Sequence, residues 1–285
     1  MSVRVICDSS QNVPAAYLQH LGIVECQASL IFGNEVYLNK VDMPEAEFYR
    51  RLASLPKDAP LPTTTQPSPG QFIDALQQIK AEGASSAIIT AVSAKLSGTY
   101  NSAVQAAEHE TDIPVTLWDT SGVSIGGGWQ TIRAAEMAQA GASHDEIMAA
   151  LPAIRANINT VFTVDTLKYL AASGRLSSAQ AMMGTLLNVK PMLMVDDGLL
   201  KPFGRERGRK SAKKALIEAS RTKAGDRPVR VAIAHTNVLA EAQEFESDVR
   251  AALNVRELII IELGPVLAAL AGPGVLALGA LQETP

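Results

Sequence analysis

Short apolar segments alternate with helical segments through the first half of the chain, and this alternation constrains the fold more than any other feature. The apolar run SSAIITAV (85–92) precedes the helical pattern TYNSAVQAAEHE (99–110), and VTLWDT (115–120) precedes GGGWQTIRAAEMAQAG (126–141). Buried strands that alternate with helices are typical of parallel βαβ units. We therefore expect an α/β fold whose first half contains a parallel sheet covered by helices.

The second half of the chain follows a different pattern. Strand-like runs such as 160–165 and 189–204 are separated by long helical runs, and the Asp-Asp-Gly step at 196–198 predicts a hairpin. This pattern is typical of an α+β domain with an antiparallel sheet. A chain of 285 residues can form one large α/β domain or two domains. The change in pattern favours two, an N-terminal α/β domain at residues 1–158 and a C-terminal α+β domain at residues 159–285.

The most apolar stretch of the chain, residues 258–281, is long enough to raise the question of a membrane span. Glu262 and the two prolines beside glycine, Pro265 and Pro273, argue against a spanning helix. We expect two buried strands around a glycine-rich turn here. The N-terminus reads as a short strand and a turn, without the features of a signal peptide.

The cysteine content indicates the redox environment of the protein, and the net charge restricts the classes of partner that it can bind. The two cysteines, Cys7 and Cys26, form neither a disulfide framework nor a metal-ligand spacing, which favours a reduced, cytoplasmic environment and no metal site. The net charge of −4 argues against a nucleic-acid-binding protein driven by overall charge.

One segment is strongly basic. Residues 205–214 read RERGRKSAKK and carry six Lys or Arg side chains. Such a run is usually a solvated face of the protein. On an acidic chain it is also the best candidate surface for an acidic partner, for a nucleotide held by a kinase, or for transient contact with a membrane surface. We take Arg205, Arg207 and Arg209 as the candidate partner surface.

Common catalytic motifs are missing from the sequence. It contains no GxSxG elbow, no P-loop and no GxGxxG fingerprint. His235 follows the apolar run VAIA and is the one histidine with a candidate functional position. A hydrolase or transferase that uses His235 is therefore one hypothesis, although no nucleophile motif accompanies it.

Three polar turns stand out instead, at residues 7–10 (CDSS), 62–68 (PTTTQPS) and 95–100 (KLSGTY). Ligands of parallel α/β sheets bind beyond the carboxyl ends of the strands, where such turns meet. Ser97 fits the N-cap of a helix, and Gly98 allows close approach to the backbone. The turn is either a simple helix cap or an anion site. Because a dianionic phosphate usually recruits a cation, hydroxyl and N–H donors favour a monoanion such as a carboxylate.

Four motifs together resemble the DegV family of bacterial fatty-acid-binding proteins. They are TTTQPSPGQF, SAKLSGTYNSA, VDTLKYLAASGRLSSAQAMMGTLLNVKPML and GPVLAALAGPG, in the order in which the family has them. The resemblance implies two domains with one long-chain fatty acid in an apolar tunnel between them. It also implies a non-catalytic carrier without a cofactor, whose bound carboxylate is phosphorylated by a separate fatty acid kinase subunit.

The resemblance also assigns residues. Thr64, Ser97 and the Gly98 N–H match the family's carboxylate site, and Arg175 matches a position near the pocket. Thr65 and Thr99, which flank these residues, complete the candidate pocket. Arg207 matches a basic position linked with the kinase partner. The Met- and Leu-rich stretch 182–194 fits a tunnel wall or an ordinary core.

One departure from the family pattern affects the functional prediction. Leu270 stands where the family often has a histidine that belongs to the head-group region. We include Leu270 among the pocket candidates, and its side chain puts the phosphotransfer step in question. The alternative function is therefore a lipid-responsive regulatory or storage module that has no kinase partner.

Overall fold

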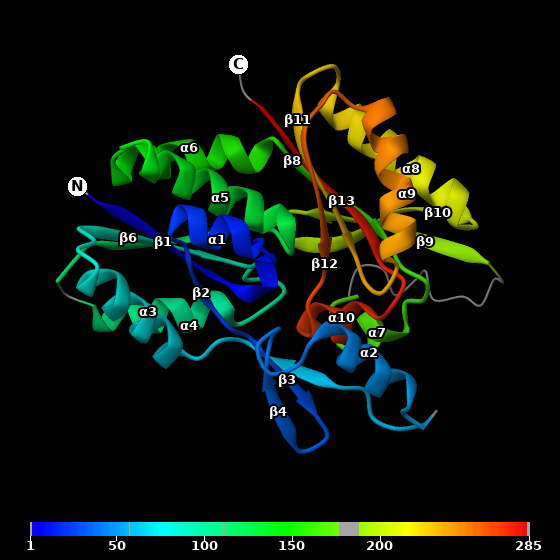
Figure 1. The fold of residues 1–285 in the computed structure, drawn as a ribbon, viewed down its shortest axis with the longest axis horizontal. Helices are drawn as coiled ribbons and strands as arrows, with labels where there is room; N and C mark the ends of the chain where they lie inside the picture. Colours follow the sequence, from blue (N-terminus) through cyan, green and yellow to red (C-terminus); the bar gives the residue numbers. More distant parts are fainter. Residues whose placement is uncertain (1, 57, 111, 177–187, 284–285) are drawn as a thin grey trace. The chain divides into compact units, whose positions relative to one another are not determined.

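The computed structural model describes residues 2–56, 58–110, 112–176 and 188–283, which form two units (Figure 1). Unit 1 contains the N-terminal residues up to Ser29 together with Thr65–Asn157, and unit 2 contains Leu30–Thr64 together with the residues from Ile158 onward. The chain therefore crosses between the units three times. We describe each unit by itself.

Unit 1 is built on a parallel sheet of four strands in the order β2-β1-β6-β7. The strands are β1 (Val3–Asp8), β2 (Val24–Cys26), β6 (Ser86–Ala91) and β7 (Val115–Asp119). Ile6 lies opposite Val24 in one neighbouring strand and opposite Ile89 in the other. The parallel sheet that the alternation predicts is confirmed.

Helices cover both faces of this sheet (Figure 1). They are η1 (Ser9–Gln11), α1 (Ala15–Leu21), α3 (Pro69–Ala81), α4 (Thr99–His109), α5 (Ile125–Gln139) and α6 (His144–Ala156). On the face covered by α3 and α4, Phe72 and Ala103 pack in one core with Ile6 and Ile89. Burial of an aliphatic or aromatic side chain contributes about 2 kcal/mol, so this core stabilises the whole layer.

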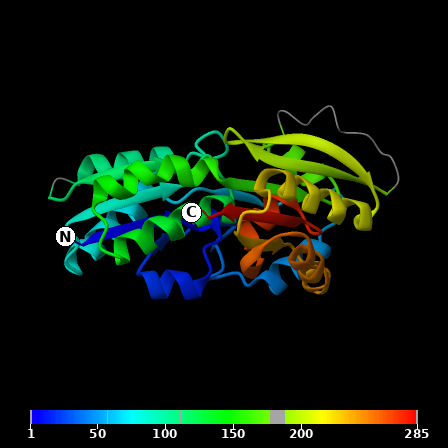
Figure 2. The same cartoon turned by 90° about the horizontal axis from the view of Figure 1, so that it is seen from above.

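Unit 2 contains a mixed sheet of six strands in the order β10-β9-β8-β13-β11-β12. The strands are β8 (Ile158–Thr163), β9 (Val189–Asp196), β10 (Leu199–Arg207), β11 (Val229–His235), β12 (Val255–Glu262) and β13 (Leu276–Gln282). Only β11 and β12 pair in parallel. The predicted hairpin joins β9 to β10 (Figure 2), and Asp197 and Gly198 both have the positive φ that its tight turn requires.

The helices of unit 2 are α7 (Lys168–Ala172), α8 (Arg209–Ala224), α9 (Leu239–Ala252) and α10 (Pro265–Ala271). Leu216 of α8 and Phe245 of α9 pack with Val231 and Leu278 of the sheet. Met192 belongs to the same core, as expected for the core interpretation of residues 182–194. Residues 182–187 of that stretch lie outside the described residues.

The prediction for residues 258–281 was wrong in one respect. Two strands are present, but the seven-residue helix α10 lies between them where a turn was expected. Pro265 occupies its first turn, and the following VLAALA consists largely of good helix formers. No helix in the described ranges is both long and apolar enough to span a membrane.

Residues 30–64 group with the C-terminal half, whereas the predicted domains placed them in the N-terminal half. They contain nearly all of β3 (Ser29–Phe32), β4 (Glu35–Leu38), α2 (Glu45–Ala53) and most of β5 (Thr63–Thr65). Asn39 explains the grouping, because its side-chain oxygen accepts a hydrogen bond from the Val266 N–H at 3.1 Å and so caps α10. Lys40 donates to the Glu262 carbonyl at 3.4 Å.

Candidate functional site

A cavity of about 290 Å³ lies within unit 2. Its walls come from three segments, namely Leu61–Thr64 at the start of β5, the region from Tyr169 to Arg175, and Ala269 with Leu270 at the end of α10. Thr64, Arg175 and Leu270 were predicted from the sequence as pocket residues, and the structure brings these three together in one cavity.

The end of α7 directs Arg175 to this cavity. Gly174 has a φ of +75°, and the Arg175 N–H donates to the Leu170 carbonyl at 3.2 Å, which is the pattern of a Schellman helix end. The guanidinium then folds back and donates to the Ser173 carbonyl at 2.5 Å. A glycine at this position therefore ends the helix and sets the direction of Arg175, which lines the cavity.

The chemistry of the cavity favours one negative charge. Among the lining residues that the structure describes, Arg175 is the only one with a charged side chain. Thr63, Thr64 and Ser173 add hydroxyl groups. A cation surrounded by hydroxyl donors binds a carboxylate well.

Sequence reasoning missed Thr63, Ser173 and Tyr169 as lining residues. Thr63 directly precedes a predicted site residue, and Ser173 lies two positions before Arg175, so proximity in the sequence was an available signal. Tyr169 offered no such signal. Its place in the wall depends on α7 packing against α10 (Figure 1).

Leu270 contributes an apolar surface to the cavity wall. A histidine at this position would titrate near neutral pH, whereas a leucine cannot exchange a proton. Leu270 therefore adds no proton donor or acceptor to the described part of the wall.

The remaining carboxylate candidates lie in unit 1, at the turn before α4. Ser97 was predicted as the N-cap, but the structure places Gly98 there. The Ser97 N–H donates to the Ser93 carbonyl at 3.1 Å, so this turn places Ser97 one residue before the cap. Its hydroxyl oxygen accepts from the Thr99 N–H at 3.3 Å and lies 2.9 Å from the Thr99 hydroxyl.

The Gln66 side chain lies close to the backbone of Gly98. A Cβ atom at Gly98 would lie 3.1 Å from the Gln66 side-chain nitrogen, which is closer than ordinary contact. The space that Gly98 leaves open is therefore occupied by the Gln66 side chain in this structure. The contact also joins the LSGTY turn to the TTTQPS segment, in which Thr65 is exposed.

His235 lies at the end of β11 and is 1 % exposed. Burial lowers the pKa of its imidazole, and its Nδ1 has no hydrogen-bond partner among the described residues. His235 is not one of the residues that line the cavity. Within the described residues no group of three or more His, Cys, Asp or Glu side chains is arranged to hold a metal ion.

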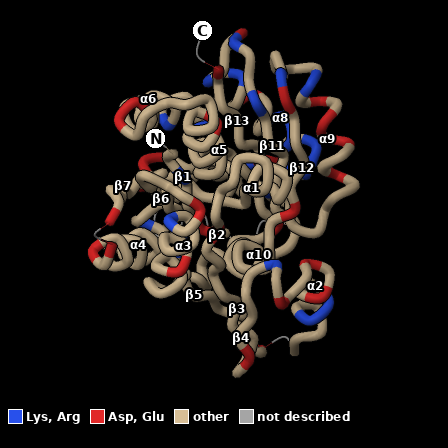
Figure 3. Tube along the Cα trace, turned by 60° about the vertical axis from the view of Figure 1, so that its left-hand side comes forward, with Lys and Arg blue, Asp and Glu red and all other residues tan. Residues whose placement is uncertain are grey.

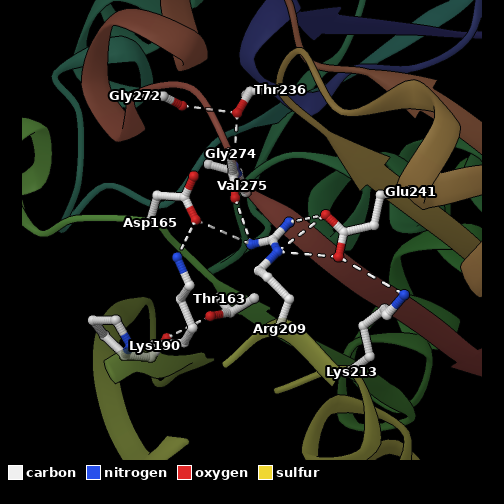
Figure 4. Close-up of polar contacts among 11 residues, drawn as sticks. Thr163, Asp165, Lys190, Arg209, Lys213, Thr236, Glu241, Gly272, Gly274 and Val275 are labelled. Atoms are coloured by element: carbon white, nitrogen blue, oxygen red, sulfur yellow. Dashed lines mark hydrogen bonds and ion pairs between the residues drawn. The ribbon is translucent and has the colours of Figure 1, made fainter. Parts of the chain in front are cut away.

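The three candidate arginines of the basic run have different environments. Arg205 and Arg207 are exposed on β10, an edge strand of the six-stranded sheet. Arg209 instead forms an ion pair with Glu241 at 2.7 Å and donates to the Gly274 carbonyl at 2.8 Å (Figure 4). Both signs of charge occur along α8 and α9 (Figure 3). Arg209 is therefore less exposed than Arg205 and Arg207 and takes part in ion pairs within unit 2.

Comparisons of the sequence identify relatives over nearly the whole chain. The profile of the family described as uncharacterised protein, DegV family, matches residues 2–283. A DegV domain-containing protein of Streptomyces coelicolor is 32% identical over 276 residues, which covers 96% of each chain. Another, from Deinococcus radiodurans, is 34% identical over 278 residues and 96% of each chain.

Solved structures agree with this relationship. A DegV family protein of Thermus thermophilus, solved with reference to its fatty acid binding, has a TM-score of 0.90 at 30% identity, over 99% of this chain and 100% of the other. DegV of Bacillus subtilis, described as a fatty acid binding protein, has a TM-score of 0.88 at 29% identity, over 99% and 100% of the two chains. The chain therefore belongs to the DegV family.

Proposed function

We propose that this protein binds a long-chain fatty acid and presents its carboxylate to a separate kinase subunit, without catalysing a reaction alone. The observation that carries the proposal is the cavity of unit 2, where Thr64 and Arg175 provide a hydroxyl and a cation. Relatives of about the same length, at 29% and 30% identity, are described as fatty-acid-binding proteins. The proposed role requires no cofactor and places the protein in the cytoplasm.

The two ends of the ligand contribute differently to binding. Each buried methylene contributes about 0.8 kcal/mol, so an acyl chain supplies most of the affinity. The polar donors then decide which end of the ligand is held. We propose Thr64 and Arg175 of unit 2 as donors to the carboxylate, and Ser97 and the Gly98 N–H as the donors that unit 1 contributes.

Native mass spectrometry of the delipidated protein, reloaded with hexadecanoic acid, tests this proposal. The wild-type chain is expected to carry the fatty acid, and a Thr64→Val, Arg175→Gln double variant is expected to lose most of it. Thr222→Val with Arg227→Gln is the matched control, because both side chains are exposed. Absence of fatty acid on the wild-type chain would reject the proposed function.

Leu270 supports a second candidate function, a lipid-responsive regulatory or storage module without a kinase partner. Its aliphatic side chain lies in the wall of the cavity that contains Arg175. The wall therefore has no proton donor or acceptor at position 270, where the family often has a histidine. Acyl-phosphate formation with the cognate kinase and ATP separates the two functions, because turnover by the wild-type carrier would reject the second one.

Arg205 and Arg207 are the proposed contact for the kinase subunit or for an anionic membrane surface. Both side chains are exposed on an edge strand. Replacing both by glutamine is expected to slow acyl-phosphate formation while fatty acid binding is retained.

A further inference from the structure

Tyr169 lies in direct contact with the backbone of a glycine. The ring lines the cavity, and a Cβ atom at Gly272 would lie 2.3 Å from its Cδ2 and 2.7 Å from its Cε2. Gly272 also has a φ of +81°, a conformation that other residues rarely adopt. The ring therefore rests against the loop Gly272–Gly274 and has no space to move further toward it.

Hydrogen bonds from Thr236 fix this loop (Figure 4). The Thr236 hydroxyl donates to the Gly272 carbonyl at 2.8 Å and accepts from the Val275 N–H at 2.8 Å. The Gly274 N–H donates to the Thr236 carbonyl at 2.9 Å. Thr236 is fully buried, so water does not compete for these bonds. The surface against which Tyr169 rests is consequently rigid.

A charged cluster holds the other side of the same loop. Arg209 donates to the Gly274 carbonyl, and the Asp165 carboxylate lies so close that a Cβ atom at Gly274 would be 2.2 Å from its Oδ2. Lys190 pairs with Asp165 at 2.6 Å, and Glu241 pairs with Arg209 at 2.7 Å (Figure 4). The side chains of Arg209 and Glu241 are 21% and 22% exposed, so salt screens this pair less than a surface pair, whereas Asp165 in the other pair is 48% exposed.

We propose that Tyr169 sets the width of the cavity and thereby selects against fatty acids that are branched next to the carboxylate. The inference rests on the proposed function, because Thr64 and Arg175 place the carboxylate in the cavity that Tyr169 lines. A substituent on the carbon beside the carboxylate would compete with the ring for the same space. Asp165 and Arg209 act as positioning residues, since they hold the loop that supports the ring.

Dissociation constants for hexadecanoic acid and 2,2-dimethylhexadecanoic acid test the role of Tyr169. The wild-type protein is expected to favour the unbranched acid by about tenfold, the discrimination that one or two methyl groups provide in a tight pocket. Tyr169→Ala is expected to remove this preference, and Tyr169→Phe to retain it. An unchanged preference in Tyr169→Ala would overturn the inference, whereas a wild-type protein that binds neither acid would reject the proposed function as well.

The positioning role has a separate test. Arg209→Gln is expected to reduce the preference about threefold, because the loop loses one of its hydrogen bonds, and Arg209→Lys to recover part of it. Arg221→Gln, on the same helix but exposed, is the matched control. If Arg209→Gln fails to fold, Asp165→Asn replaces it with the same expectation. A preference that stays at the wild-type value in every folded variant would overturn the positioning role.

Discussion

The two glycines beside the candidate site residues differ in how strictly they are required. Gly98 in unit 1 has a φ of −74°, and a Cβ atom there would lie 3.1 Å from the end of the flexible Gln66 side chain. Gly272 in unit 2 has a φ of +81°, and a Cβ atom there would lie 2.3 Å from the Tyr169 ring. A side chain such as Gln66 can turn away at little cost, whereas a ring packed in a wall cannot. The comparison indicates that the backbone of Gly272 requires a glycine more strictly than that of Gly98 does.

Gly272→Ala is expected to have the largest effect. The positive φ and the contact with the ring together should lower the free energy of unfolding by about 3 kcal/mol. Gly98→Ala should lower it by less than about 1 kcal/mol, since Gln66 can change rotamer. Urea unfolding of both variants measures the difference. Equal losses would contradict the comparison, and adding Tyr169→Leu to Gly272→Ala should recover the part caused by the ring.

The candidate donor in unit 2 should contribute more to fatty acid binding than the candidate donor in unit 1. Arg175→Gln is expected to weaken fatty acid binding about 30-fold, because a hydrogen bond to a charged group contributes about 2 kcal/mol. Ser97→Ala is expected to weaken it about threefold, since the Ser97 hydroxyl provides a hydrogen bond to the carboxylate but no positive charge. Isothermal titration with hexadecanoic acid measures both. A larger loss in Ser97→Ala than in Arg175→Gln would place the main anion contact in unit 1.

Arg209 and Arg207 offer a comparison within the basic run. Arg209→Gln should lower the free energy of unfolding by about 2 kcal/mol, because the Gly274 carbonyl loses its Arg209 donor and Glu241 keeps only the longer pair with Lys213 at 3.8 Å. Arg207→Gln should change it by less than about 0.5 kcal/mol, as expected for an exposed side chain. Thermal unfolding of the two variants measures this difference. Similar melting temperatures would show that Arg207 and Arg209 contribute equally to stability and would contradict the comparison.

The smallest expected effect concerns pH. Burial lowers the pKa of His235, so the folded state favours the neutral imidazole. The corresponding stability is fully present above the unfolded pKa of about 6.5 and is lost as the pH falls through the lowered folded pKa. Melting temperatures between pH 8 and pH 5 should therefore fall more for the wild-type protein than for His235→Gln. Parallel curves would show that His235 does not contribute to the acid sensitivity.

Local patterns predicted most of the fold. The strand–helix alternation of unit 1 and the turn at Asp197 and Gly198 depend on neighbouring residues, so periodicity and turn chemistry were sufficient. The grouping of residues 30–64 with unit 2 could not be predicted in this way, because it depends on Asn39 capping a helix more than 200 residues later.

The candidate site was only partly predictable for the same reason. Thr64 and Arg175 were named through resemblance to a family, since no local motif marks them as neighbours. Ser97 was placed one position too far into the helix because the hydrogen bond to Ser93 was not visible in the sequence. Tyr169 was missed altogether, because its contact with Gly272 joins segments about 100 residues apart.

The central claim is that the cavity containing Thr64 and Arg175 holds the carboxylate of a fatty acid. Binding of hexadecanoic acid and of its methyl ester to the wild-type protein and to Arg175→Gln tests this claim most directly. The wild-type protein should bind the acid more tightly than the ester, and Arg175→Gln should remove most of that difference. An equal preference for the acid in both proteins would contradict the claim.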